Sequence, residues 1–122
     1  MKKAYRFLLE CGNGYLLTLS EGRPSGRPLG SFMEHEGHLY FGTAATKALY
    51  YQLLKNPDVQ IVGLKPYTAR WIRISGHVVE VYDLELKEKL MNEKPRIYAH
   101  FQDPDDPLFA LFRLDDPFVE YM

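Results

Sequence analysis

The sequence predicts a mainly β domain of the α+β class, in which an antiparallel β-barrel carries a few peripheral helices. Strand-like segments follow one another through short turns, and helical periodicity is confined to three short segments. So few helices cannot cover both faces of a doubly wound parallel sheet, whereas they can close the ends of a barrel. With 122 residues, of which 46% are hydrophobic, the chain is expected to form one domain over residues 1–122.

The first half of the chain is expected to form a helix, three strands and a second helix. Apolar positions recur at helical spacing up to Gly12, which predicts a helix over residues 3–11. Gly37 predicts a tight hairpin turn, and Pro57 cannot continue the second helix. After the first helix, the expected elements are a strand over 15–21, a turn cluster over 22–26, strands over 27–36 and 38–43, and a helix over 46–56.

The second half is expected to be mostly strand. Partial alternation over residues 69–83 predicts a long bent strand, with Gly76 at the bend. The other expected elements are a strand over 58–65, a helix over 84–93, a loop over 102–107 and a last core strand over 108–114. Residues 102–122 hold one arginine and six acidic residues. We expect a solvated acidic tail; the alternative is a tail that packs over a basic site on its own or a neighbouring subunit.

Charge and cysteine content exclude several classes of protein. The net charge is −1, so the overall balance does not favour nucleic acid or an anionic membrane as partner. Cys11 is the single cysteine, which excludes an intrachain disulfide and a cysteine-based metal site. The N-terminus lacks the apolar stretch of a signal peptide, and no later run reaches membrane-spanning length. We therefore expect a cytoplasmic protein.

A candidate anion site lies at the junction between the third expected strand and the second expected helix, in FGTAATKALYYQLLKNP (41–57). A helix N-terminus presents unpaired N–H groups and a partial positive charge, where an anion can bind. Thr43 and Thr46 offer hydroxyls, and Lys47 adds a cation that is unfavourable for the helix dipole unless an anion is near. The alternative is that Thr46 only caps the helix and Lys47 is solvated.

A second basic residue, Arg27, is expected at the same place. If the strand over 27–36 pairs with the strand over 38–43 around Gly37, Arg27 lies near the end from which Thr43 and Lys47 emerge. Arginine binds phosphate bidentately and lysine binds it as a point charge, so a phosphate is the expected guest. The alternative is a surface arginine beside a turn.

Five segments together resemble the pyridoxamine 5′-phosphate oxidase-like family of FMN-binding split β-barrel proteins. They are RPLGS (27–31), LYFGT (39–43), Thr46-Lys47, LKNPDV (54–59) and WIRISG (71–76). The resemblance covers roughly residues 14–115 and implies an antiparallel split β-barrel that binds FMN in a groove between the two subunits of a homodimer.

The resemblance also implies which residues border the cofactor. Arg27, Thr46 and Lys47 match the phosphate site, and Trp71 falls where some members have a glutamine that reaches the flavin from the other subunit. For Trp71 the alternative is a side chain packed in the barrel core. The full set of expected cofactor-binding residues is Arg27, Pro28, Leu29, Gly30, Gly42, Thr43, Thr46, Lys47 and Trp71.

The resemblance does not extend to the substrate, and several functions stay open. True pyridoxamine phosphate oxidases end in basic and aromatic residues, whereas this chain ends in LDDPFVEYM. It resembles the short relatives, which include flavin reductases, nitroimidazole-resistance-type reductases and FMN electron carriers. We expect an FMN-dependent oxidoreductase that takes electrons from NAD(P)H or a redox partner. The alternatives are a non-enzymatic FMN carrier, a barrel that binds haem or a deazaflavin, and a structural dimer with an empty groove.

No catalytic residue can be named from the sequence. His35 and His38 straddle a turn without a third convergent ligand, so we expect no metal site. His100 could reach a flavin edge from the partner subunit; the alternative is a loop residue in an aromatic patch. Cys11 is expected to be a buried thiol on an inward helix face. In a flavoenzyme the ring performs the hydride chemistry, so the absence of an acid–base motif is compatible with redox activity.

Overall fold

The computed structural model describes all residues from Met1 to Met122. Its helices are α1 (Lys2–Cys11), α2 (Ala48–Lys55), α3 (Leu84–Glu93) and the short 3-10 helix η1 (Pro95–Ala99). Its strands are β1 (Gly14–Ser20), β2 (Arg23–Leu29), β3 (Phe32–His35), β4 (His38–Ala44), β5 (Asp58–Leu64), β6 (Trp71–Val81) and β7 (Phe109–Tyr121). The prediction of a mainly β fold with peripheral helices is confirmed, and no helix has the length and apolar character needed to cross a membrane.

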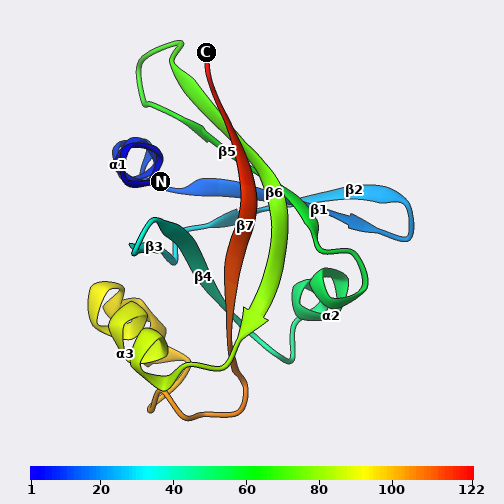
Figure 1. Cartoon of the computed structure of the whole chain (residues 1–122), viewed down its shortest axis with the longest axis vertical. Coiled ribbons are helices and arrows are strands. Elements are labelled where there is room, and N and C mark those ends of the chain that lie inside the picture. Colours follow the sequence, from blue (N-terminus) through cyan, green and yellow to red (C-terminus); the bar gives the residue numbers. More distant parts are fainter.

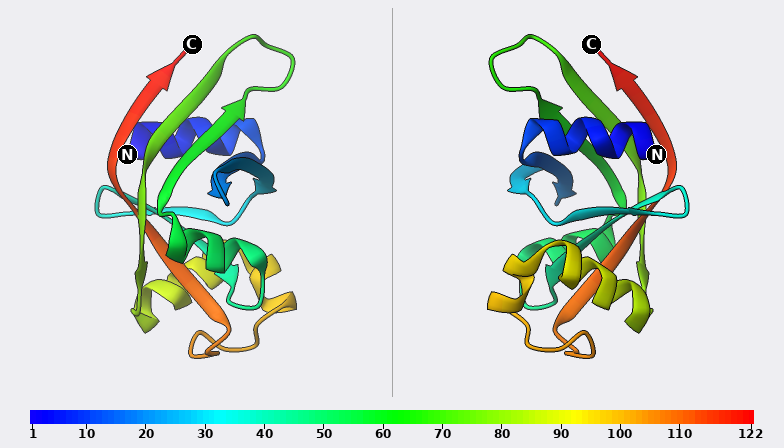
Figure 2. Two further views of the ribbon diagram at one scale, coloured as in Figure 1. Left: turned by 90° about the vertical axis from the view of Figure 1, so that its right-hand side faces the viewer. Right: turned by 90° about the vertical axis from the view of Figure 1, so that its left-hand side faces the viewer.

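The strands form one strongly curved antiparallel sheet in the order β2-β1-β5-β6-β7-β4-β3. Two long strands, β6 and β7, run through its middle and pair along most of their length. Figures 1 and 2 show α1 lying across one half of the curved sheet, with α2 and α3 at the opposite end. The helices therefore cover two different parts of the curved sheet.

The core is divided in two, and each part is covered by different helices. One face of α1 is apolar at helical spacing and buries Ala4, Phe7, Leu8 and Cys11 in the larger cluster, so the buried-thiol prediction is confirmed. The smaller cluster joins α3 and η1 to β3, β4 and the start of β7; its members include Met33, Leu90, Met91, Ile97, Phe101 and Phe109. Burial of these side chains ties α3 and η1 to the sheet end where α2 also begins.

The expected bend at Gly76 is confirmed as a β-bulge. The register of β6 against β7 shifts between Ser75 and His77. A Cβ at Gly76 would lie 2.8 Å from the carbonyl oxygen of Asp115 and 2.9 Å from Leu114, so only glycine fits there. On the facing strand Asp116 has φ of 49°, which completes the irregularity.

Two predictions for the first half of the chain are wrong. Residues 27–36 do not form one strand: the chain leaves β2 at Leu29, and β3 begins at Phe32 at the other edge of the sheet. The predicted turn cluster over 22–26 is largely strand, since β2 begins at Arg23 and pairs with β1 through a turn at Glu21 and Gly22. The hairpin around Gly37 is confirmed, but it joins only β3 and β4.

The prediction of a solvated acidic tail over residues 102–122 is also wrong, because most of this segment is a central strand. β7 runs from Phe109 to Tyr121 and pairs with both β4 and β6. Its acidic side chains are used within the sheet: Asp115 pairs with Arg113, and Glu120 pairs with Arg73. The second helix begins at Ala48 instead of residue 46, so Thr46 does not cap it.

Candidate functional site

A large open pocket of about 1100 Å³ lies between β2, the start of α2 and the η1 segment. Its volume is slightly above the roughly 300–1,000 Å³ common for ligand pockets. Its wall combines apolar side chains, such as Leu29 and Phe109, with several cationic ones. The one acidic side chain in the lining, Glu93, already lies 3.5 Å from the ammonium of Lys89. The pocket is thus suited to a ligand that is partly apolar and partly anionic.

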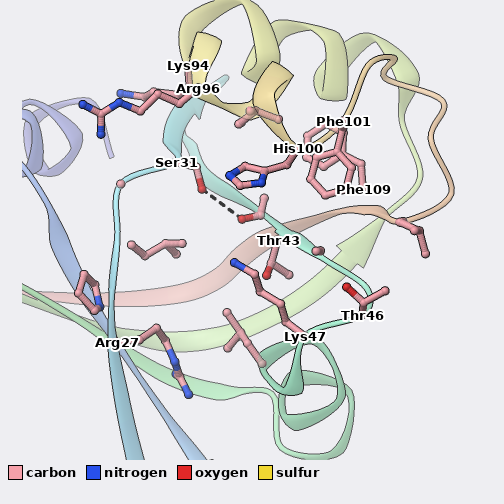
Figure 3. A pocket seen from close by; sticks show the side chains of 18 of the residues that line it. Arg27, Ser31, Thr43, Thr46, Lys47, Lys94, Arg96, His100, Phe101 and Phe109 are labelled. Carbon is pink, nitrogen blue, oxygen red and sulfur yellow. Dashed lines mark hydrogen bonds between the residues drawn. The ribbon is translucent and has the colours of Figure 1, made fainter.

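The start of α2 forms one side of this pocket. Lys47 occupies the N-cap position with extended backbone, and no side chain caps the first turn of the helix, which also lacks an acidic residue. Thr43 is buried at the end of β4, while Thr46 and Lys47 are exposed. Figure 3 shows these three residues together on one side of the pocket. A cation at an uncapped helix N-terminus is unfavourable alone and becomes favourable when an anion binds there.

Arg27 lines the same pocket, although not by the predicted route. It lies near the end of β2, which pairs with β1 and not with β4. Its Nη1 donates to Leu16 O at 3.1 Å and to Thr18 Oγ1 at 2.8 Å, and its Nη2 donates to Ser25 Oγ at 3.0 Å and to Gln52 Oε1 at 2.9 Å. Burial lowers the pKa of this guanidinium from its ordinary value.

A second basic group faces the pocket from the opposite side and is absent from the predicted set. Lys94 and Arg96 flank Pro95 at the start of η1, and Figure 3 shows them on the far side from Lys47, with His100 between the two groups. His100 thus reaches the pocket of its own chain. The Lys-Pro-Arg triplet after a helix was the available signal, but sequence spacing does not show that η1 folds back over β4.

Two of the predicted glycines line the pocket, and each lies close to other side chains. A Cβ at Gly42 would lie 2.7 Å from a ring carbon of Phe109 and 3.0 Å from Leu90, both in the smaller core cluster. A Cβ at Gly30 would lie 2.7 Å from the side-chain oxygen of Asn13. Core packing therefore explains Gly42, whereas at Gly30 the only neighbour is an exposed side chain that can turn away.

Of the nine residues expected to border the cofactor, eight line this one pocket. They are Arg27, Pro28, Leu29, Gly30, Gly42, Thr43, Thr46 and Lys47. Trp71 does not line it; the side chain is half-buried at the start of β6, where the Arg73 guanidinium lies 5.4 Å from its ring centre. Because Trp71 was expected to act from a partner subunit, its role stays a prediction.

The sequence matches the family model described as pyridoxamine 5′-phosphate oxidase over residues 1–116. No curated protein matches it. Among solved structures, a NimC/NimA family protein from Clostridium acetobutylicum is 34% identical with a TM-score of 0.92, and the match covers 100% of this chain and 86% of that one.

Two more distant structures share the fold. A pyridoxamine 5′-phosphate oxidase-related, FMN-binding protein from Nostoc punctiforme is 23% identical with a TM-score of 0.68, over 95% of this chain and 76% of that one. HutZ, the haem storage protein from Vibrio cholerae, is 17% identical with a TM-score of 0.73, over 97% of this chain and 92% of that one. At these identities the likeness shows the fold alone.

Proposed function

Since this chain belongs to the pyridoxamine 5′-phosphate oxidase family, we propose that it binds FMN in the pocket between β2, α2 and η1. The proposal includes a flavin-dependent oxidoreductase activity, a homodimeric assembly in which Trp71 of each subunit approaches the flavin of the other, and a cytoplasmic location. The family and the FMN-binding relative from Nostoc punctiforme support the cofactor.

One observation carries the cofactor proposal: the cationic end of the pocket has no anion of its own. Lys47 stands at the uncapped start of α2, and the nearby Arg27 has no carboxylate within ion-pair distance. A phosphate monoester supplies the missing charge and accepts hydrogen bonds from the helix N-terminus. The fit is therefore between an unsatisfied positive site and a dianionic group.

The residues of this chain would bind and orient such a cofactor. Lys47 and the hydroxyls of Thr43 and Thr46 would hold the phosphate, and Leu29 with the backbone around Gly30 would border the apolar ring. When bound, FMN supplies the hydride chemistry, and the protein supplies orientation and exclusion of water. His100 would lie on the pocket wall beside a bound cofactor, where its imidazole could hydrogen-bond a substrate.

A second candidate, haem binding, is favoured by one observation. His100 places an imidazole in the pocket, and imidazole is a common axial ligand of haem iron. HutZ, which has the same fold, is described as a haem storage protein. The two candidates differ in the group that the cationic residues would bind, because FMN carries a phosphate monoester and haem carries two propionate carboxylates.

The absorption spectrum of the purified protein tests the cofactor. We expect flavin bands, and release of FMN on denaturation, identified by its mass; a haem spectrum supports the second candidate. A colourless protein that takes up neither added FMN nor haem contradicts both. NAD(P)H oxidation with a nitro or quinone acceptor separates an oxidoreductase from an FMN carrier.

The assembly is tested separately by light scattering coupled to size-exclusion chromatography. We expect a mass twice the 14.2 kDa of the chain. A protein that binds FMN as a monomer contradicts the dimer and the role of Trp71 but leaves the phosphate site standing.

A further inference from the structure

Arg27 is held by a network of neutral groups that joins β1, β2 and α2. Gln52 Oε1, on α2, accepts from Arg27 Nη2 at 2.9 Å and lies 2.9 Å from the hydroxyl of Thr18. Thr18 is buried, and its oxygen accepts from Arg27 Nη1 at 2.8 Å. The remaining acceptors are Leu16 O and Ser25 Oγ. The guanidinium is thus fixed by contacts that leave its full charge uncompensated.

The same network limits what Arg27 can do for a ligand. An arginine carries five N–H donors, and four of them are on the two terminal nitrogens. Because each terminal nitrogen already donates to two oxygens, only the Nε–H is left. A bidentate grip on a phosphate would require breaking this network. Arg27 therefore acts on a ligand mainly through its electrostatic field.

Position 52 is the place in the network where an acidic residue would most easily neutralise the charge of Arg27. A glutamate at this position would have the same length and would place a carboxylate on the guanidinium, as Glu120 does with Arg73 at 2.8 and 3.1 Å. The neutral amide keeps the geometry of such a pair without its neutralising charge. Gln52 also lines the pocket, so the uncompensated charge lies at the pocket wall.

We propose that Gln52 and Thr18 are positioning residues that fix Arg27 as an unpaired positive charge, and that this charge makes the pocket select phosphorylated flavin over neutral riboflavin. The inference rests on the proposed function, because it concerns the same pocket. It assigns the direct phosphate contacts to Lys47 and to the start of α2, and it assigns to Arg27 the long-range part of the attraction.

The test is a pair of binding titrations, with FMN and with riboflavin, on the wild-type protein and three variants. Gln52→Glu should weaken FMN binding by about tenfold or more and change riboflavin binding by less than about twofold, since only FMN carries the phosphate. Gln52→Leu keeps the charge and loses one acceptor, so its FMN preference should fall less. Gln60→Glu is the matched control: it adds the same charge on an exposed position of β5, outside the pocket.

A purely structural role for Gln52 predicts a different result. In that case the Glu and Leu variants would behave alike, and FMN and riboflavin affinities would fall together; this outcome overturns the inference. Circular dichroism checks that the variants fold. If Gln52→Glu does not fold, Ser25→Asp on the edge strand β2 brings a carboxylate to the same guanidinium and should give the same loss of FMN preference.

The proposed function and the inference about Arg27 are contradicted by different results. A folded Gln52→Glu or Ser25→Asp variant with the wild-type FMN preference overturns the inference and leaves the proposed function intact. Equal affinity of the wild-type protein for FMN and riboflavin likewise overturns the inference and leaves the proposed function intact. A wild-type protein that binds neither flavin overturns the proposed function, and the inference with it.

Discussion

Two regions of the molecule use arginine in opposite ways. On the central strands, Arg113 makes a two-pronged pair with Asp115 at 2.7 and 3.0 Å, and Arg73 makes one with Glu120 at 2.8 and 3.1 Å. Neither arginine lines the large pocket. Beside the pocket, Arg27 is surrounded by carbonyl, hydroxyl and amide oxygens alone.

The difference separates charges that serve the fold from charges left for a ligand. Arg73 and Arg113 each donate hydrogen bonds to a carboxylate, which holds their pKa above the ordinary value, whereas burial lowers the pKa of Arg27. A desolvated cation without a counter-ion lowers stability unless an anion arrives. We therefore expect substitutions in the pocket to change ligand binding, and substitutions on the central strands to change stability.

The largest expected effect is on FMN binding by the double variant Lys47→Ala with Arg27→Ala. Removing both cations should weaken FMN binding by several kcal/mol, because Lys47 supplies a charge-assisted contact of roughly 1.5–3 kcal/mol and Arg27 adds the attraction of its uncompensated charge. Fluorescence titration with FMN measures the loss. Lys55→Ala, at the far end of α2, is the control and should leave the affinity unchanged. Equal FMN affinity in the double variant and the wild type would show that the phosphate site is wrong.

An intermediate effect, on the free energy of unfolding, is expected when the pocket-lining residues Gly42 and Gly30 are replaced by alanine. Gly42→Ala should lower the free energy of unfolding by about 1–3 kcal/mol, because its Cβ would press on Phe109 and Leu90 in the core. Gly30→Ala should cost less, because its Cβ meets only the end of the exposed Asn13 side chain, which can turn away. Chemical denaturation measures both, and a larger loss for Gly30→Ala would contradict the packing assigned here.

The smallest expected effect concerns the ion pair on β7. A hydrogen bond from Arg113 holds the pKa of Asp115 below its ordinary 3.8. The pair therefore contributes stability above about pH 4, and this contribution is lost as the pH falls through the lower pKa of the folded state. Asp115→Asn should lower the free energy of unfolding at pH 7 by up to about 1 kcal/mol, with a smaller difference near pH 2.

Asp116→Asn is the matched control for that ion pair. Asp116 is exposed, has no arginine partner and adopts a positive φ of 49° that asparagine tolerates. Denaturation curves at both pH values should leave this variant close to the wild type. A pH-independent loss for Asp115→Asn would mean that packing, and not the charge pair, accounts for the effect.

Local signals in the sequence were sufficient for much of the fold. The apolar face of α1 and the glycine bend in β6 depend on neighbouring residues, and both were predicted. The break between β2 and β3 depends on pairing with β1 on one side and β4 on the other, which local sequence does not specify. In the sequence, Asp116 and Pro117 are typical of a turn, but β7 continues through them and its pairing with β6 resumes at Phe118.

The sequence predicted some of the pocket residues, but the predicted route by which Arg27 approaches Lys47 was wrong. Arg27 was expected to reach Lys47 through a hairpin, whereas α2 brings the two together by packing Gln52 against β1 and β2. Lys94 and Arg96 were missed because their position depends on η1, which is held by burial of Ile97 and Phe101 in the smaller core cluster. Charge and helix-terminus arguments from the sequence predicted the phosphate-site residues, and the resemblance to a known family identified the expected ligand as FMN.

The most direct test of the account is a crystal structure of the protein with FMN bound. The account predicts phosphate oxygens within hydrogen-bond distance, about 3 Å, of Lys47 Nζ and of the first N–H groups of α2, with Arg27 still bonded to Thr18 and Gln52. An FMN phosphate in solvent, or an Arg27 side chain released from that network to grip the phosphate, would contradict it.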